Sequence, residues 1–214
     1  MGREFIDLFD GWAETYDDSV KGFDPQYKAV FTDYETILNA VVKNTSGNVL
    51  EFGVGTGNLT KKLLLAGHQV VGVEPSSAMR KIAQAKLPAL RLMEGDFINF
   101  PESPLQIESI VSTYAFHHLT DIEKETAVQH FGEMLPVNGK IIFADTVFES
   151  ELAKEAAIVK AKDKGFTDLA EDLHREYYTT IDVLKCIFVT HYFDVTFKQM
   201  NEFVWLITAT KNRE

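Results

Sequence analysis

A glycine-rich segment that follows a short apolar run carries the clearest chemical meaning in the sequence. Residues 51–58 read Glu-Phe-Gly-Val-Gly-Thr-Gly-Asn. Glycines let a backbone turn sharply and come close to a ligand where a Cβ atom would intrude. A dinucleotide-binding G-x-G-x-x-G motif counted from Gly53 requires glycine at position 58, where Asn58 stands instead. The segment therefore predicts close approach to a ligand and weakens the dinucleotide hypothesis, with a plain strand-to-helix turn as the alternative.

Acidic residues end or follow the next two predicted strands. Glu74 comes 21 residues after Gly53, where a carboxylate can accept hydrogen bonds from both hydroxyls of a ribose. Asp96 can accept a hydrogen bond from an exocyclic amine, and the ring of Phe97 beside it can cover a purine. Together these side chains predict an adenosine site, with an ordinary turn or helix cap as the alternative for Asp96.

Alternating strands and helices must bring these residues to one edge of a sheet. Apolar runs bounded by turn signals predict strands at 49–53, 69–74, 90–93, 107–113 and 140–146, then a hairpin at 193–198 and 203–210. Helical spacing and caps predict helices at 4–18, 26–43, 58–66, 77–86, 120–135, 149–175 with a break near Gly165, and 180–189. This order predicts a doubly wound, mostly parallel α/β sheet with an antiparallel C-terminal hairpin. Its ligand site should lie beyond the carboxyl ends of the strands.

Composition and charge limit the class of protein. The 214 residues are 45% hydrophobic, and 21 Lys+Arg against 32 Asp+Glu give a net charge of −11. This length fits a single domain over residues 1–214, and the acidic balance disfavours nucleic acid as a partner. Cys186 is the only cysteine in the sequence, so no internal disulfide can form. This predicts that the protein is located in the reducing cytoplasm. The apolar runs are shorter than the roughly 18 residues of a membrane span, so no membrane partner is expected.

The motifs together resemble the class I S-adenosylmethionine-dependent methyltransferases. The resemblance rests on E-x-G-x-G-x-G at 51–57, on Glu74, on Gly95-Asp96, and on F-D-x-W-A-x-x-Y-D at 9–17. More narrowly, residues 1–5, 114–121 and 143–149 are similar to the YrrT-like methyltransferases of Bacillus relatives. This resemblance implies a Rossmann-like sheet of seven strands whose last strand is antiparallel and lies beside the fifth. Its parts would be a helical cap (1–44), a cofactor-binding half (45–146), a helical substrate-side segment (147–190) and the hairpin (191–214).

The resemblance also implies how the cofactor, which becomes S-adenosylhomocysteine, is held. Gly53 and Gly55 would pass close to its methionine part, and Glu74 would hold the ribose. Asp96 with Phe97 would hold the adenine, and Ser76 would lie beside the nucleoside. Tyr114 is a further residue expected to bind the cofactor. S-adenosylmethionine carries a net charge of about +1, so acidic side chains including Glu51 would attract it. A role for Glu51 in orienting the turn through backbone amides is an equal alternative.

Methyl transfer is an in-line displacement at the sulfonium carbon, so the protein mainly aligns the acceptor and excludes water. Tyr16 is expected to close over the sulfonium, or else to pack at a helix–sheet seam. His117 is the candidate general base, because adjacent residues at a strand end face opposite ways and His118 is expected to be the packed one. His, Asp and Glu show no metal-ligand spacing in the sequence, which predicts a site without metal.

The segment after the fourth predicted strand bears on the acceptor. Residues 112–115 read Ser-Thr-Tyr-Ala and depart from the Asn/Asp-Pro-Pro-Tyr/Phe loop of exocyclic-amine DNA methyltransferases. This departure removes the most obvious nucleic-acid substrate, and a small-molecule acceptor is expected. Residues 149–178 join the fifth and sixth predicted strands on the ligand side of the sheet, where they either contact the acceptor or pack as a lid on the first helices. A cofactor-binding sensor without turnover and, less favoured, a nicotinamide-dependent reductase are the alternatives. The identity of the acceptor and the oligomeric state are left open.

Overall fold

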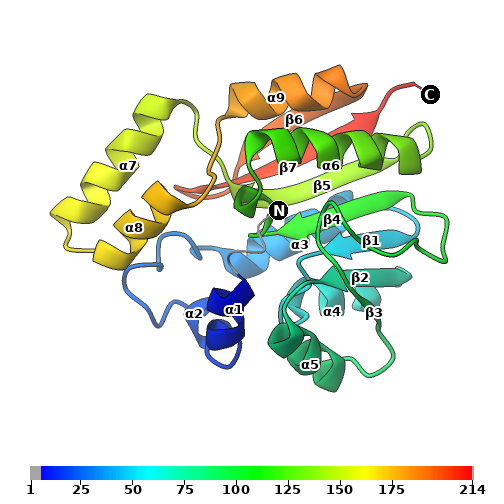
Figure 1. Cartoon of the computed structure of the whole chain (residues 1–214), viewed down its shortest axis with the longest axis horizontal. Coiled ribbons are helices and arrows are strands. Elements are labelled where there is room, and N and C mark those ends of the chain that lie inside the picture. Colours follow the sequence, from blue (N-terminus) through cyan, green and yellow to red (C-terminus); the bar gives the residue numbers. More distant parts are fainter. Residues whose placement is uncertain (1–5, 214) are drawn as a thin grey trace.

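A seven-stranded sheet forms the centre of the computed structural model, which describes residues 6–213 (Figure 1). The strand order is β3-β2-β1-β4-β5-β7-β6. The strands are β1 (Val49–Phe52), β2 (Val70–Glu74), β3 (Arg91–Glu94), β4 (Ser109–Thr113), β5 (Lys140–Thr146), β6 (Phe193–Gln199) and β7 (Val204–Lys211). β1 to β5 are parallel, whereas β7 is antiparallel to both β5 and β6. The predicted doubly wound sheet is confirmed, with β7 beside β5. Residues 1–5, which contribute to the narrower resemblance, lie outside the described residues.

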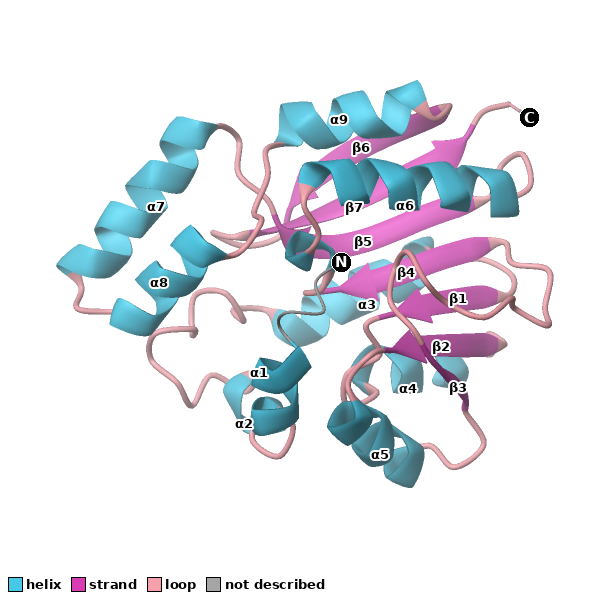
Figure 2. Ribbon diagram, viewed as in Figure 1, coloured by secondary structure: helices cyan, strands magenta, loops and turns pink. Residues whose placement is uncertain are grey.

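Helices cover both faces of this sheet (Figure 2). They are α1 (Ile6–Trp12), α2 (Tyr16–Ser19), α3 (Tyr34–Asn44), α4 (Asn58–Leu65), α5 (Ser77–Lys86), α6 (Asp121–Met134), α7 (Glu151–Asp163), α8 (Thr167–Arg175) and α9 (Ile181–Thr190). Ile37 of α3 and Leu63 of α4 join one core cluster, and Phe131 of α6 and Phe188 of α9 join the other. Among residues 6–213, none of the helices combines the length and apolarity needed to cross a bilayer.

The neighbouring strands β1 and β2 are buried along their whole length. Every residue of β1 and of β2 is buried, as expected for parallel strands with helices on both sides. Two of these residues, Glu51 and Glu74, are acidic and only 1% and 5% exposed. The fold therefore places two carboxyl groups in apolar surroundings near the carboxyl end of the sheet, where the ligand site was expected.

The N-terminal helices are shorter than their apolar spacing predicts. The segment expected as one helix over 4–18 forms α1 and α2, and the helix expected from residue 26 begins only at Tyr34. Asp33 has a left-handed backbone with φ of 61° and cannot continue a helix from the residues before it. The predicted break near Gly165 is confirmed, because Gly165 (φ 72°) separates α7 from α8.

A capping box at the start of α6 yields a stability prediction. The Thr120 hydroxyl accepts a hydrogen bond from the Glu123 amide, and the Glu123 carboxylate accepts one from the Thr120 amide, as the sequence predicts. Thr120→Ala should lower the free energy of unfolding by about 1 kcal/mol in urea titrations, because an amide at the helix start loses its partner. Thr126→Ala, in the exposed middle of the same helix, is the matched control and should change stability much less. Equal effects of the two substitutions would contradict this role of the cap.

Candidate functional site

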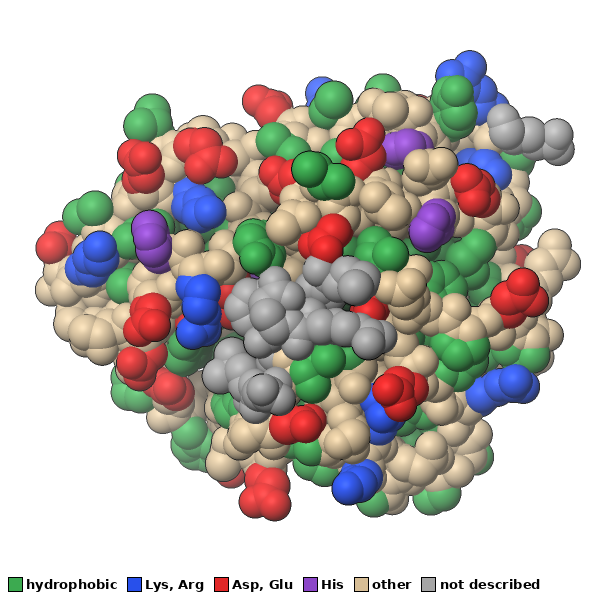
Figure 3. Space-filling view, viewed as in Figure 1, with side chains coloured by type: hydrophobic (Ala, Val, Ile, Leu, Met, Phe, Trp, Pro, Cys, Tyr) green, Lys and Arg blue, Asp and Glu red, His purple; other side chains and the backbone are tan. Residues whose placement is uncertain are grey.

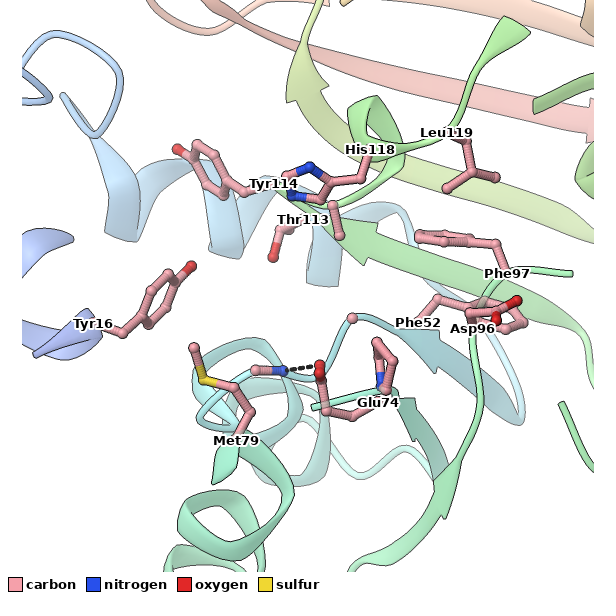
Figure 4. A pocket seen from close by; sticks show the side chains of 14 residues that line it. Tyr16, Phe52, Glu74, Met79, Asp96, Phe97, Thr113, Tyr114, His118 and Leu119 are labelled. Carbon is pink, nitrogen blue, oxygen red and sulfur yellow. Dashed lines mark hydrogen bonds between the residues drawn. The ribbon is translucent and has the colours of Figure 1, made fainter. Parts of the chain in front are cut away.

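A cavity opens at the carboxyl ends of β1, β2 and β4, where ligands of open α/β sheets bind. Figure 4 shows its walls: Tyr16 and Met79 on one side, Tyr114 and His118 opposite. Its lining consists of Tyr16, Phe52, Gly53, Gly55, Glu74, Pro75, Met79, Asp96, Phe97, Thr113, Tyr114, Ala115, His118 and Leu119. Seven of the sequence-predicted residues therefore share one cavity, namely Tyr16, Gly53, Gly55, Glu74, Asp96, Phe97 and Tyr114.

The glycine-rich turn forms the floor of the cavity for two different physical reasons. Gly53 (φ 66°) is packed so tightly that an added Cβ would lie 2.7 Å from the Cβ of Ala115. Gly55 (φ 56°) has open space instead, since an added Cβ would meet nothing within 4 Å. Both need the left-handed backbone that glycine adopts without strain. Gly53 thus shapes the turn, and Gly55 leaves room above it.

Glu74 anchors the loops on either side of the cavity. Its carboxylate accepts a hydrogen bond from the Gly55 amide at 2.8 Å and another from the Ser76 amide at 2.8 Å (Figure 4 shows the first). Burial raises the pKa of Glu74 from 4.5 to about 6, although the two amide hydrogen bonds work against this rise. The carboxyl group therefore changes protonation within the range of common buffers.

Asp96 and Phe97 form the far end of the cavity. Asp96 accepts hydrogen bonds from the amides of Ile98 and Asn99 at 2.9 and 2.8 Å. It therefore organises its own turn, as one of the two sequence hypotheses holds, while also lining the cavity. The ring of Phe97 stacks on Phe52 with centroids 5.0 Å apart. The aromatic wall beside the carboxylate is thus fixed by core packing.

The N-terminal helices are fastened over the glycine-rich turn. Asp17 of α2 accepts hydrogen bonds from the Thr56 hydroxyl at 2.6 Å and the Asn58 amide group at 3.1 Å, and it pairs with Lys86 of α5. These contacts hold Tyr16 against the cavity. Burial, followed by the nearby Tyr34, raises the pKa of Tyr16 well above its usual value, so its hydroxyl stays protonated. No spacing pattern in the sequence reveals this contact network, although the F-D-x-W-A-x-x-Y-D motif ends at Asp17.

Ser76 and Glu51 lie beneath the cavity rather than in its wall. The Ser76 hydroxyl caps α5 by accepting from the Met79 amide at 3.1 Å, and it donates to Asp10 of α1. Glu51 is buried beside Thr60, and its Oε2 has no hydrogen-bond partner in the structure. Ser76 therefore caps α5 and holds it to α1, and neither side chain is part of the cavity wall.

The two adjacent histidines are placed differently from the expectation. His118 lines the cavity and His117 does not, so the prediction that His117 would be the more open residue is wrong. Phe116–His118 form a short 3₁₀ helix, η2, in place of an extended strand end, and side chains no longer alternate between two faces. His117 instead contacts Asp145 through Nδ1 at 2.5 Å and Glu176 through Nε2 at 3.2 Å.

The surroundings drive the pKa values of the two imidazoles apart. Burial opposes the charged form of His117, but the carboxylates of Asp145 and Glu176 outweigh it and raise its pKa from 6.5 to about 10. Burial and the charge of His117 lower the pKa of His118 to about 3. His118 therefore faces the cavity as a neutral imidazole.

The fold also gathers potential metal ligands that sequence spacing does not reveal. Ligand atoms of His117, His118 and Glu176 all lie within 4.8 Å of one another. Glu176 follows α8 and lies far from η2 in the sequence, so no local spacing joins it to the two histidines.

The buried carboxyl of Glu51 predicts a pH-dependent stability. Burial raises its pKa from 4.5 to about 8, so the folded state favours the neutral form and the free energy of unfolding falls as pH rises from about 5 to about 8. Glu51→Gln has no such group to ionise and should not lose this stability. The free energy of unfolding of the variant minus that of the wild type should therefore be about 2 kcal/mol larger at pH 9 than at pH 6. Scanning calorimetry across this range measures it, with the exposed Glu171→Gln as control. Parallel pH profiles of wild type and Glu51→Gln would contradict the burial of a neutral carboxyl.

Comparisons with known proteins identify the family. Residues 49–139 match the methyltransferase domain family. An uncharacterized methyltransferase of Oceanobacillus iheyensis is 57% identical over 211 residues, which cover 99% of each chain. The uncharacterized methyltransferase YrrT of Bacillus subtilis is 54% identical over 212 residues, covering 99% of this chain and all of YrrT.

Solved structures agree on the fold. Magnesium protoporphyrin IX methyltransferase from Synechocystis, crystallised with bound S-adenosylhomocysteine, superposes with a TM-score of 0.75 at 16% identity, covering 99% of this chain and 100% of that one. A possible histamine N-methyltransferase from Thermotoga maritima gives a TM-score of 0.70 at 20% identity, with 97% and 100% coverage. The chain therefore belongs to the YrrT-like methyltransferase family and has the fold of class I S-adenosylmethionine-dependent enzymes.

Proposed function

We propose that this protein transfers a methyl group from S-adenosylmethionine to a small-molecule acceptor, and that the cofactor lies in the cavity at the carboxyl ends of β1, β2 and β4. One observation carries the proposal: the Glu74 carboxylate is fixed by the Gly55 and Ser76 amides beside the open space at Gly55. A rigid acceptor group for a ribose and an unobstructed turn for the rest of the cofactor are thereby placed together.

The residues that line the cavity indicate where each part of the cofactor lies. The methionine part lies over Gly53 and Gly55, the ribose hydroxyls donate to Glu74, and the adenine lies between Asp96 and Phe97. S-adenosylmethionine has a net charge of about +1, which the carboxylates of Glu74 and Asp96 attract. Tyr114 completes the wall beside the sulfonium, Ser76 holds Glu74 and the start of α5 in place, and Glu51 is buried outside the wall.

The reaction is an in-line displacement, for which the protein supplies alignment and exclusion of water. Tyr16 presents its protonated hydroxyl to the cavity from α2 and is positioned to close over the sulfonium. His117, the base candidate from the sequence, has both ring nitrogens engaged by carboxylates. We therefore assign it a positioning role behind His118, which faces the acceptor side of the cavity.

A small acceptor is favoured by the segments that surround the cavity. Residues 16–27 are held to α4 and α5 through Asp17 and to α8 through Gln26 and Tyr27, which bond Asp168 and Asp172. On the described part of the face shown in Figure 3, acidic and basic side chains are interspersed, without the basic stripe that tracks a nucleic-acid backbone. The exposed thiol of Cys186 suits a reducing cytoplasm, where we place the protein.

Substitution of the two cavity acids tests the cofactor site. Glu74→Ala and Asp96→Ala should each weaken S-adenosylmethionine binding about tenfold or more in calorimetry, because hydrogen bonds to a charged group contribute about 1.5–3 kcal/mol. Glu94→Ala is the matched control, since Glu94 also ends a strand but is exposed and pairs with Arg80. Unchanged affinity in both cavity variants would show that the cofactor binds elsewhere.

The raised pKa of Glu74 predicts how cofactor affinity varies with pH. Hydroxyl donors favour the ionised carboxylate, so S-adenosylmethionine affinity should rise with pH through about 6 and then level off. Glu74→Gln should flatten this part of the profile. An affinity that falls across the same range in the wild type would contradict the assignment.

Turnover is tested separately from binding. Cofactor labelled in its methyl group, incubated with the protein and a metabolite extract, should yield a labelled product identifiable by mass spectrometry. Tight cofactor binding with no labelled product from any extract would favour a sensor.

A further inference from the structure

Three buried side chains meet behind the cavity wall that His118 forms. His117 and His118 come from η2, and Glu176 comes from the loop after α8. We propose that these three residues form a binding site for one divalent transition-metal ion, with Zn²⁺ as the best-fitting ion. The site uses imidazole and carboxylate ligands, which suit zinc. It does not depend on the proposed cofactor site.

The ligand atoms are spaced as a small cation requires. Oε2 of Glu176 lies 3.2 Å from Nε2 of His117 and 3.7 Å from Nδ1 of His118. Ligands of a tetrahedral zinc ion at bond lengths of about 2.0–2.1 Å lie about 3.3 Å apart. The third separation, between the ligand nitrogens of His117 and His118, is at most 4.8 Å and has to shorten when the ion binds.

Outer contacts hold the ligands as they are held in known metal sites. Asp145 contacts Nδ1 of His117, which leaves Nε2 directed at Glu176. A carboxylate on the second ring nitrogen is the usual partner of a metal-bound histidine. The Tyr178 hydroxyl donates to Oε2 of Glu176 at 2.9 Å, and its ring stacks on His117 with centroids 4.8 Å apart.

A buried lysine joins the two segments that supply the ligands. Lys124 is 1% exposed, and its ammonium group donates to the Leu119 carbonyl, one residue after η2, and to the Tyr177 carbonyl at 2.7 Å. This bridge fixes the distance between the histidines and Glu176 before any ion arrives. Such preorganisation lowers the cost of assembling three ligands.

The charge of the group also fits a cation. Two buried carboxylates, Asp145 and Glu176, face the two nitrogens of His117. A cation bound between Nε2 of His117 and Glu176 is attracted by both carboxylates. Three protein ligands leave a fourth position for water or an acceptor atom. Because His118 lines the cavity, the ion would support the wall on the acceptor side.

Titration of the untagged full-length protein with Zn²⁺ after chelator treatment tests the site. Calorimetry should show one ion per chain, and His118→Ala should weaken its affinity about tenfold or more while leaving the contacts of His117 with Asp145 and Glu176. His191→Ala is the matched control, since His191 is half-buried and pairs with Glu125 at 3.6 Å, outside the proposed cluster. It should bind Zn²⁺ as the wild type does. X-ray absorption should show nitrogen and oxygen neighbours at about 2.0–2.1 Å and no sulfur at about 2.3 Å, which excludes Cys186.

Three results would overturn the proposal: no Zn²⁺ binding by the wild type, equal binding by His118→Ala, or a sulfur neighbour. Melting temperatures with and without S-adenosylhomocysteine, measured on the same samples, show whether each variant is folded. They also separate the two proposals, because a protein stabilised by S-adenosylhomocysteine that binds no Zn²⁺ keeps its methyltransferase assignment and loses the metal site.

Discussion

The hydrogen bonds of the Glu74 carboxylate connect the parts of the molecule on which the site depends. One oxygen accepts from the Gly55 amide in the turn after β1, and the other accepts from the Ser76 amide at the start of α5. Both loops are thereby fixed to the end of β2. The cost of burying a carboxylate is offset by these two amides, as is usual for buried charge. The same carboxylate also faces the cavity. One side chain therefore both holds the two loops together and is the proposed acceptor for the ribose hydroxyls.

The N-terminal helices extend this arrangement outward. Ser76, whose amide binds Glu74, donates its hydroxyl to Asp10, and Asp17 binds Thr56 and Asn58 just past the glycine-rich turn. Asp10 and Asp17 thus hold α1 and α2 against the start of α5 and the segment between β1 and α4. The cavity is consequently enclosed by segments whose positions depend on the same turn that forms its floor.

The sequence predicted those features that depend on local spacing. The strand order along the chain, the capping box and the shared location of Gly53, Glu74 and Asp96 follow from periodicity and from the rule that parallel strands end at one edge. The prediction failed where a single backbone angle sets the start of a helix or where a contact with a distant segment sets the position of a side chain. Asp33 shortens α3 through its left-handed conformation, which apolar spacing does not register.

The histidines illustrate the second kind of failure. A 3₁₀ turn cannot be distinguished from a strand end in so short a segment, and it exchanged the expected positions of His117 and His118. Their partner Glu176 comes from the loop after α8, far along the chain, and Lys124 makes a long-range bridge beside it. No pattern within one segment contains that information.

A crystal structure with S-adenosylhomocysteine would show directly whether Glu74 holds the cofactor. We expect density in the cavity at the carboxyl ends of β1, β2 and β4, with the ribose hydroxyls on Glu74, the adenine beside Asp96 and Phe97, and the sulfur facing Tyr16. Density for the ligand at another place on the molecule, or a filled cavity in which the ribose does not contact Glu74, would contradict it.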